Sequence, residues 1–319
     1  MKKMAFPLFS DSSKVRTPSN LALQILIFLA VFIVIYLAQG IFASFFVLPE
    51  MFGAMDRAGV FDSPASFRYK EIYDIAMSVS MQDNVLIPTL FTTVFGIILS
   101  IIYCRFIEKR SLSSMGFRPK KIVPRYFGGL LVGIALMAAI TGISLLTGVN
   151  SIRLEGDINF GIILLYFSGF FIQGASEEII FRGYLMNSVG GKHSVFTALT
   201  VSSLAFALAH IANPGITVLA FVNLVLFAVF AGLYILCFDD IWGACAIHSI
   251  WNFTQGNVFG ISVSGTGSTP SIFRTTAESD ISWLTGGNFG IEGSLITTFI
   301  LLAASVLVVL RMKKKYKEN

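Results

Sequence analysis

The sequence predicts an all-α protein, a polytopic transmembrane helix bundle of about eight spans. Of the 319 residues, 55% are hydrophobic and only 13% are charged, and the mean hydropathy of +0.77 is too high for a soluble domain. Apolar segments of bilayer length recur along the chain, and basic residues gather between alternate segments. These observations together indicate an integral membrane protein.

Eight apolar segments are candidates for helices that cross all or most of a bilayer. Their approximate bounds are 21–47, 85–104, 127–147, 161–188, 194–211, 216–238, 241–256 and 294–311. The seventh segment is short and polar. The first is too long for the apolar region of a signal peptide, so we expect it to stay in the protein as a span.

The positive-inside rule orients the bundle with both termini in the cytoplasm. We expect the protein to lie in the plasma membrane of a bacterium. All but five of the 23 Lys and Arg residues, Arg182 included, then fall on the cytoplasmic side. The exceptions are Arg57, Arg68, Lys70, Arg153 and Arg274. This distribution explains the net charge of +5, so the expected surroundings are the lipid bilayer and no nucleic-acid partner is predicted.

We expect three parts of the chain. Residues 1–126 would hold an N-terminal cytoplasmic segment, two spans, an external loop and a basic cytoplasmic loop. Residues 127–256 would form a membrane-embedded core. Residues 257–319 would form an external loop rich in Gly, Ser and Thr, the last span and a basic tail. The first external loop contains a candidate interfacial helix near "SFRYKEIYDIAMSV". The second, near 257–293, either folds over the top of the bundle or is a solvated connection.

The stretch "GASEEIIFRGYLM", Gly174 to Met186, places charged residues inside the fourth apolar segment. A charge at membrane depth costs about 2.5–3.5 kcal/mol on insertion scales, so such residues indicate function. Glu178 and Arg182 are four residues apart and can form an ion pair on one helix face. Glu177 is then turned about 100° away and is free for another contact.

Two further segments carry polar residues at the same spacing. Phe206 and His210 stand in "FALAH", just before "NPG" ends the helix, and His248 and Asn252 share a face in "HSIWN". A single intramembrane His most often makes a hydrogen bond between helices. Two of them beside a pair of glutamates indicate a functional site. His193 lies in a basic turn, and we assign it no role.

Helix rise decides whether these residues can meet. Glu177 lies about 18 Å from the turn at Gly190 and Gly191, and His210 lies about 25 Å back along the antiparallel partner, a difference of little more than one helical turn. His248 is only about 10 Å from the turn at Asp239 and Asp240. The seventh helix must therefore be tilted or sunken for His248 to reach the same point.

A carboxylate, two imidazoles and an amide are the groups needed to add water to a carbonyl carbon, because they supply a base, an aligning group and donors for the oxyanion. The sequence therefore indicates peptide hydrolysis within the membrane. It contains no H-E-x-x-H zinc motif, no G-x-S-G nucleophile and no pair of G-x-G-D and Y-D aspartates. Cys104, Cys237 and Cys245 lack metal-site spacing, and we expect them to be small core residues.

These motifs resemble those of the CPBP family, the CAAX proteases and bacteriocin-processing enzymes also called the Abi family, which includes the type II CAAX prenyl endopeptidases. That family is marked by E-E-x-x-x-R, F-x-x-x-H and H-x-x-x-N/D on successive membrane helices. They stand here as Glu177-Glu178-x-x-x-Arg182, Phe206-x-x-x-His210 and His248-x-x-x-Asn252. The resemblance is specific within about 160–256, and "RSLSSMGF" at 110–117 is similar to a weaker segment that precedes the family's core.

The resemblance implies that residues 127–256 are the catalytic core of an intramembrane glutamate-type endopeptidase, a peptide-bond hydrolase without a cofactor. Glu177 and His210 would activate water, and His248 and Asn252 would stabilise the oxyanion. Glu178, Arg182 and Phe206 would support the site. The implied partner is a membrane-associated peptide or protein substrate.

Three alternatives stay open. Two His and one Glu can also bind zinc with an open fourth position, although Asn252 is a poor zinc ligand and favours the metal-free hypothesis. The same pocket would serve a non-catalytic peptide-binding or bacteriocin self-immunity protein. Intramembrane Glu and His also mark proton-coupled transporters, but no two-fold repeat is visible. Similar bacterial proteins are associated with peptide pheromone or bacteriocin processing and immunity, and in a bacterial source prenylated CAAX proteins are not the expected substrate.

Overall fold

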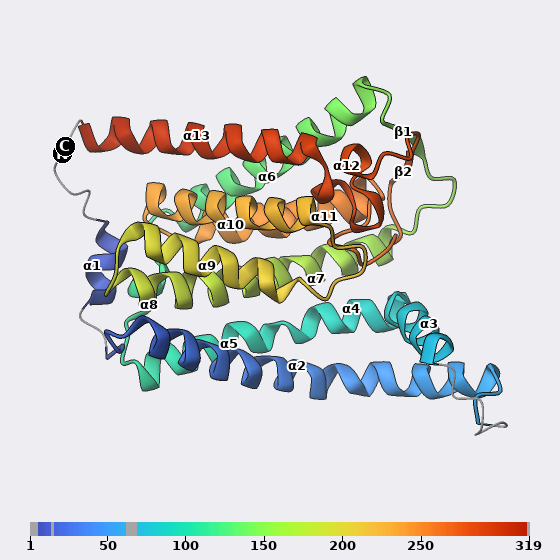
Figure 1. Cartoon of the computed structure of the whole chain (residues 1–319), viewed down its shortest axis with the longest axis horizontal. Helices are drawn as coiled ribbons and strands as arrows, with labels where there is room; N and C mark the ends of the chain where they lie inside the picture. The colour runs from blue at the N-terminus through green and yellow to red at the C-terminus, as the bar shows by residue number, and fades with distance from the viewer. Residues whose placement is uncertain (1–5, 14–15, 62–68, 318–319) are drawn as a thin grey trace.

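A computed structural model describes residues 6–13, 16–61 and 69–317, and these form a helix bundle (Figure 1). The predicted all-α polytopic class is confirmed. The helices are α1 (Pro7–Ser13), α2 (Leu21–Arg57), α3 (Tyr69–Ser80), α4 (Asp83–Thr92), α5 (Val94–Ile102), α6 (Ile122–Leu146), α7 (Phe160–Glu178), α8 (Asn187–Gly190), α9 (Val195–Ala209), α10 (Val218–Phe238), α11 (Trp242–Phe253), α12 (Ser282–Thr285) and α13 (Leu295–Lys317). The π-helical stretches are η2 (Tyr103–Ile107), η4 (Ile179–Met186) and η5 (Thr254–Val258), the 3₁₀ turns are η3 (Leu112–Met115), η6 (Gly287–Phe289) and η7 (Ile291–Gly293), and the strands are β1 (Asn150–Leu154) and β2 (Phe273–Ala277).

All eight predicted segments contain helix, but they differ in length. Within the described residues, six helical stretches are long and apolar enough to cross a membrane: Leu21–Arg57, Asp83–Ile107, Ile122–Leu146, Phe160–Gly190, Val218–Phe238 and Leu295–Lys315. The fifth and seventh segments form shorter helices, α9 with 15 residues and α11 with 12. Helix α2 continues ten residues past its expected end because Pro49 does not stop it.

Helices α7, α9 and α10 begin at residues whose side chains cap the first turn, whereas α11 has no side-chain cap. Asn159 accepts a hydrogen bond from the backbone N–H of Ile162, and Ser194 accepts one from Thr197. Thr217 caps α10 in the same way. Such caps satisfy the first free N–H groups of a helix, so the local sequence fixes where α7, α9 and α10 start.

Helix α11 forms the centre of the bundle and packs mainly against α6 and α7. It begins beside Asp240 and Ile241, which are themselves buried. Close approach depends on glycine: a Cβ on Gly129 of α6 would lie 2.3 Å from the carbonyl oxygen of Gly243, and one on Gly174 of α7 would lie 2.5 Å from the amide nitrogen of Ser249. Small residues at such contacts let membrane helices pack backbone to backbone.

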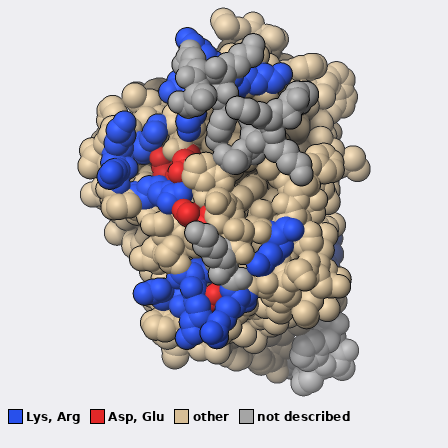
Figure 2. All heavy atoms as spheres, turned by 90° about the vertical axis from the view of Figure 1, so that its left-hand side faces the viewer, with Lys and Arg blue, Asp and Glu red and all other residues tan. Residues whose placement is uncertain are grey.

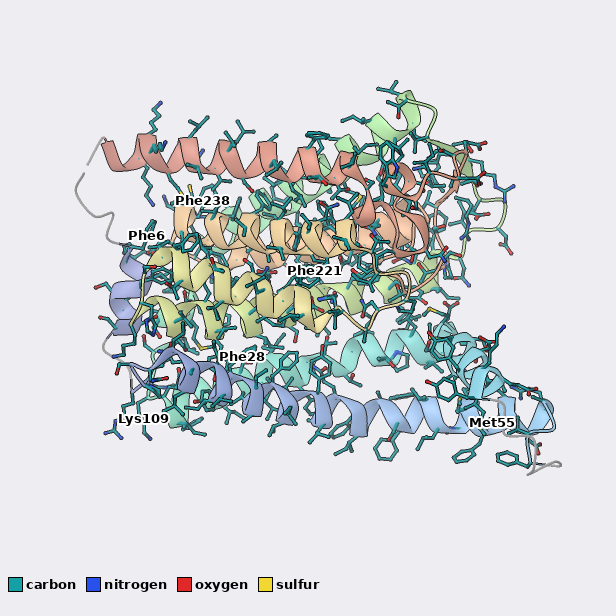
Figure 3. All side chains as sticks on the ribbon, in the orientation of Figure 1. Phe6, Phe28, Met55, Lys109, Phe221 and Phe238 are labelled. Atoms are coloured by element: carbon teal, nitrogen blue, oxygen red, sulfur yellow. The ribbon has the colours of Figure 1, made fainter. Side chains whose placement is uncertain are left out.

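The long first span covers one side of the bundle. Phe28 of α2 points inward (Figure 3), with its ring centroid 5.9 Å from that of Phe181 and 5.6 Å from that of Tyr184. Most other apolar side chains of α2, such as Leu26 and Leu37, are exposed, as expected of a surface that faces lipid. The predicted helix near 66–79 is present as α3, and its first residues, 66–68, lie outside the described residues.

The segment from 257 to 293 folds over the bundle, so the solvated-connection alternative is wrong. Phe289 and Ile291 are fully buried there, and β2 pairs antiparallel with β1, which follows α6. This two-stranded sheet was not predicted. It ties the second long loop to the segment between the third and fourth spans at the end of the bundle opposite α1 (Figure 1).

Basic side chains gather at the end of the bundle where α1 lies, as Figure 2 shows. The end of α13 lies at the same end as α1 (Figure 1). Lys2, Lys3, Lys14 and Arg68, which the count of basic residues includes, lie outside the described residues. Cys104, Cys237 and Cys245 are free and buried, in agreement with their expected role as core residues.

Candidate active site

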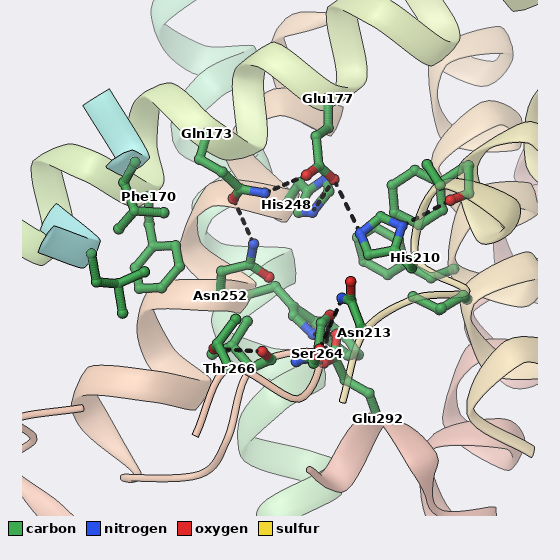
Figure 4. Close-up of a pocket in the computed structure, with 18 of the residues that line it drawn as sticks. Phe170, Gln173, Glu177, His210, Asn213, His248, Asn252, Ser264, Thr266 and Glu292 are labelled. Carbon is green, nitrogen blue, oxygen red and sulfur yellow. Dashed lines mark hydrogen bonds and ion pairs between the residues drawn. The ribbon is translucent and has the colours of Figure 1, made fainter. Parts of the chain in front are cut away.

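The four residues predicted to carry the chemistry line one cavity of about 190 Å³ (Figure 4). Glu177 comes from the last turn of α7, His210 from the end of α9, and His248 and Asn252 from one face of α11. The four side chains point into the same space (Figure 4). The structure thus brings together residues that are up to 75 positions apart in the sequence.

Glu177 holds the centre of this cluster. Its Oε1 accepts a hydrogen bond from Gln173 Nε2 at 2.6 Å. Its Oε2 lies 3.7 Å from His210 Nε2 and 3.6 Å from His248 Nε2, slightly beyond direct hydrogen-bond distance. Among the described residues this buried Oε2 has no hydrogen-bond partner. Polar groups at such separations are commonly bridged by water.

The tautomer of His210 follows from its backbone contact. Its Nδ1 lies 2.8 Å from the carbonyl oxygen of Phe206, one helical turn earlier. A carbonyl oxygen can only accept, so Nδ1 carries a proton. In the neutral ring, Nε2 is then an acceptor that faces Glu177. The spacing F-x-x-x-H therefore sets both the orientation of the His210 ring and the direction of the Nε2 lone pair toward Glu177.

Glu178 and Arg182 form the predicted ion pair, with 3.0 Å between Arg182 Nη1 and Glu178 Oε1, and neither side chain is exposed. The same Oε1 lies 2.9 Å from His248 Nδ1. The guanidinium lies 4.5 Å above the ring of Phe206. Arg182 was counted among the cytoplasmic basic residues; its side chain is buried, and a carboxylate and an aromatic face compensate its charge.

Asn252 is the fourth polar side chain of the cluster around Glu177. It is 5% exposed, and its Nδ2 donates to Gln173 Oε1 at 2.8 Å. Gln173, which the motifs did not include, therefore contacts both Glu177 and Asn252. Its position four residues before Glu177 was a signal that could have identified it, because residues at this spacing share a helix face.

The loop over the bundle adds a second carboxylate to the wall of the cavity, and no motif indicated it. Glu292 Oε2 accepts hydrogen bonds from the backbone N–H of Ser264 at 2.7 Å and from Gln255 Nε2 at 3.1 Å. Its Oε1 lies 3.3 Å from Trp251 Nε1. Asn213, just after α9, donates to the carbonyl oxygen of Ser264 at 2.9 Å. These contacts fasten the loop against the two helices that carry His210 and His248.

The segment "RSLSSMGF" braces the stretch that carries Arg182. Arg110 is buried, and its guanidinium lies 2.7 Å from Ser188 Oγ, 3.3 Å from the carbonyl oxygen of Tyr184 and 3.4 Å from that of Gly183. It also pairs with Glu108 at 3.2 Å. Arg110 thus donates to two backbone carbonyl groups of the π-helical stretch η4.

The side chains around Glu177 bear on the zinc alternative. Among the described residues, no group of three or more His, Cys, Asp and Glu side chains is arranged to hold a metal ion. The Nδ1 atoms of both histidines face protein acceptors, in Phe206 and Glu178, so the nitrogens available to a metal are the two Nε2 atoms near Glu177 Oε2. The remaining polar side chain of the cluster, Asn252, is an amide and not a usual zinc ligand.

Residues 159–254 match the model of the family described as "Type II CAAX prenyl endopeptidase Rce1-like". The matched range runs from the cap of α7 to the end of α11 and includes every side chain of the cluster around Glu177. The comparisons with curated proteins and with solved structures found no match. The match confirms the family that the three motifs indicated. Residues 159–254 are therefore an Rce1-like domain of the CAAX protease family, set within a membrane-spanning chain.

Proposed function

We propose that this protein is an intramembrane endopeptidase that hydrolyses a peptide bond with water activated by Glu177 and His210. One observation carries the proposal: Glu177 Oε2 and His210 Nε2 lie 3.7 Å apart, and both face the cavity as acceptors. A water molecule between two acceptors donates a proton to each of them. Its lone pair is then left to attack a carbonyl carbon.

When the water attacks, one of its protons moves to the carboxylate of Glu177. The water oxygen forms a bond to the scissile carbonyl carbon while Glu177 takes one proton from the water. His210 holds the second O–H and fixes the direction of attack. Glu177 then gives its proton to the leaving amide nitrogen as the C–N bond breaks, which leaves a carboxyl group and an amine. Such general acid–base catalysis contributes about 10²- to 10⁴-fold to a rate.

Asn252 and His248 are proposed to stabilise the oxyanion of the intermediate. Asn252 Nδ2 has two hydrogens, and Gln173 takes one of them, so a second remains for the oxyanion. His248 donates from Nε2 only as an imidazolium, because Glu178 already faces its Nδ1. The charge of that imidazolium would lie between the carboxylates of Glu177 and Glu178. We propose that no metal takes part.

The proposed substrate is a membrane-associated peptide or protein segment. Apolar and aromatic side chains, including Leu90, Phe170 and Phe227, line the cavity beside the polar cluster, so the site suits a hydrophobic segment with its backbone exposed. Glu177 lies within Phe160–Gly190, a helical stretch long and apolar enough to cross a membrane, so this site would lie at membrane depth.

Cleavage of a defined probe tests the proposal. A quenched fluorogenic peptide that ends in Cys-aliphatic-aliphatic-X would be offered in detergent micelles, with and without an S-farnesyl group. We expect the purified protein to cleave one or both forms, and His210→Ala to lose cleavage while it stays folded. Glu71→Gln, an exposed carboxylate on α3, is the matched control for Glu177→Gln and should cleave normally. Cleavage retained by both His210→Ala and Glu177→Gln would contradict the proposal, and binding without cleavage would favour the peptide-binding alternative.

A further inference from the structure

Gln173 links the two halves of the proposed machinery. It lies on α7, one turn before Glu177, and its Nε2 donates to Glu177 Oε1 at 2.6 Å. Its Oε1 accepts from Asn252 Nδ2 at 2.8 Å. Figure 4 shows Gln173 bonded to both, with Glu177 to one side of it and Asn252 below it. One amide thus joins the carboxylate on α7 to the amide on α11.

The direction of every hydrogen bond in this row follows from the carboxylate. An ionised Glu177 can only accept, so the NH₂ group of Gln173 must face it. The carbonyl oxygen of Gln173 must then face Asn252, and a carbonyl oxygen needs a donor. Asn252 therefore has to turn its NH₂ group toward Gln173. The orientation of the Asn252 amide is set by the charge of Glu177 through Gln173.

The spacing of the two helices makes this short link possible. A Cβ on Gly174 would lie 2.5 Å from the amide nitrogen of Ser249, so α7 and α11 touch at the residue next to Gln173. Ser249 also donates from its hydroxyl to the carbonyl oxygen of Phe171 at 3.1 Å. Gln173 and Asn252 thus face each other across a backbone contact that holds them at a fixed separation.

We infer that Gln173 is a positioning residue that fixes both the carboxylate of Glu177 and the amide of Asn252 for peptide hydrolysis. The inference rests on the proposed function. Without Gln173, Glu177 loses the partner that holds Oε1, so Oε2 is no longer aimed at the water site. Asn252 is then free to turn its Oδ1 toward the oxyanion, which would repel the developing charge.

Two variants separate positioning from a structural role. Gln173→Leu keeps the size of the side chain but removes both hydrogen bonds. We expect kcat for the fluorogenic peptide to fall about 10- to 100-fold, with KM little changed, because the lost contacts orient groups that act in the transition state. The thermal midpoint should stay close to that of the wild type. The matched control is Gln24→Leu. Gln24 is a buried glutamine of α2 whose Nε2 donates hydrogen bonds to the backbone carbonyl oxygens of Pro18 and Ser188, and its replacement should leave kcat unchanged.

The second variant, Gln173→Glu, should be active only where the new side chain is protonated. A protonated carboxyl group can donate a hydrogen bond to Glu177 and accept one from Asn252, as the amide does. An ionised carboxylate can only accept, so it would face the Glu177 carboxylate without a hydrogen bond and would repel it. The other titratable side chains that line this cavity are Tyr36 of α2, His210 of α9, His248 of α11 and Glu292 of η7. We expect the ratio of variant to wild-type kcat to be highest at low pH and to fall as pH rises.

The role of Gln173 and the hydrolytic activity can fail separately. If the wild type cleaves, Glu177→Gln is inert and Gln173→Leu keeps wild-type kcat, the hydrolytic site stands and the role of Gln173 is contradicted. A ratio for Gln173→Glu that does not change with pH would also overturn it. An inert wild-type enzyme would remove the proposed function, and this inference with it.

Discussion

His248 Nδ1 lies 2.9 Å from Oε1 of Glu178, so the second glutamate of the motif orients an imidazole. The first glutamate, Glu177, faces the Nε2 atom of that ring at 3.6 Å. Two adjacent carboxylates therefore have separate tasks, because one helical step turns them to different sides of α7. Glu178 is fully buried against Arg182, whereas Glu177 is open to the cavity.

The buried pair gives the first prediction. Replacement Arg182→Met should destabilise the protein, because it leaves the Glu178 carboxylate buried without its cation. Breaking a buried pair in this way typically costs about 3–5 kcal/mol. Thermal unfolding in detergent would measure the loss, with exposed Arg153→Met on β1 as the control that should not move the midpoint. Equal midpoints for the two variants would argue against the bracing role of Arg182.

Asn252→Ala tests the oxyanion side of the site. The loss of one donor to a developing oxyanion usually lowers kcat about 10²- to 10³-fold, and KM should change little because the bond forms mainly in the transition state. Steady-state kinetics with the fluorogenic peptide would check this, beside the exposed Asn84→Ala as control. A rise in KM at constant kcat would assign Asn252 to substrate binding.

Metal analysis tests the proposed metal-free chemistry. We expect inductively coupled plasma mass spectrometry to find substoichiometric zinc in active preparations, and 1,10-phenanthroline to leave the cleavage rate unchanged. The physical reason is that the fourth polar side chain of the cluster, Asn252, is an amide that is already bonded to Gln173 and is not a usual zinc ligand. One zinc per chain that is removed together with activity, and restores it when added back, would establish the zinc-dependent alternative.

Glu292 should control how firmly the loop covers the cavity. Its Oε2 accepts the backbone N–H of Ser264, and that oxygen also lies 3.1 Å from Ser264 Oγ. In Glu292→Gln an amide replaces the carboxylate, and the charge that holds these donors is lost. We expect hydrogen–deuterium exchange at Ser264 to become faster than in the wild type, while exchange within α11 stays slow. An unchanged rate at Ser264 would mean that the loop is held by other contacts.

The sequence predicted the fold class and the four clustered residues because both depend on local spacing. Span length and the E-E-x-x-x-R, F-x-x-x-H and H-x-x-x-N patterns are helical periodicities. Gln173 obeys the same periodicity and was within reach of that reasoning. The pair of Glu178 and Arg182 followed from the same spacing, whereas the contact of the Arg182 guanidinium with the Phe206 ring depends on how α9 packs and did not.

The parts that were missed depend on long-range contacts. Strands β1 and β2 pair residues more than a hundred positions apart, and neither five-residue segment has a strong pattern of its own. Glu292 sits in a loop rich in glycine, and only the folded chain places its carboxylate beside Trp251 and Ser264. Such partners are set by tertiary packing and not by periodicity.

The activation of water by Glu177 can be measured through the single-turnover cleavage rate of Glu177→Gln. The amide keeps the size of the side chain but cannot accept the proton. We expect a rate about 10²- to 10⁴-fold below that of the wild type, with the thermal midpoint and peptide affinity preserved. A folded Glu177→Gln protein that cleaves within a few-fold of the wild-type rate would contradict it.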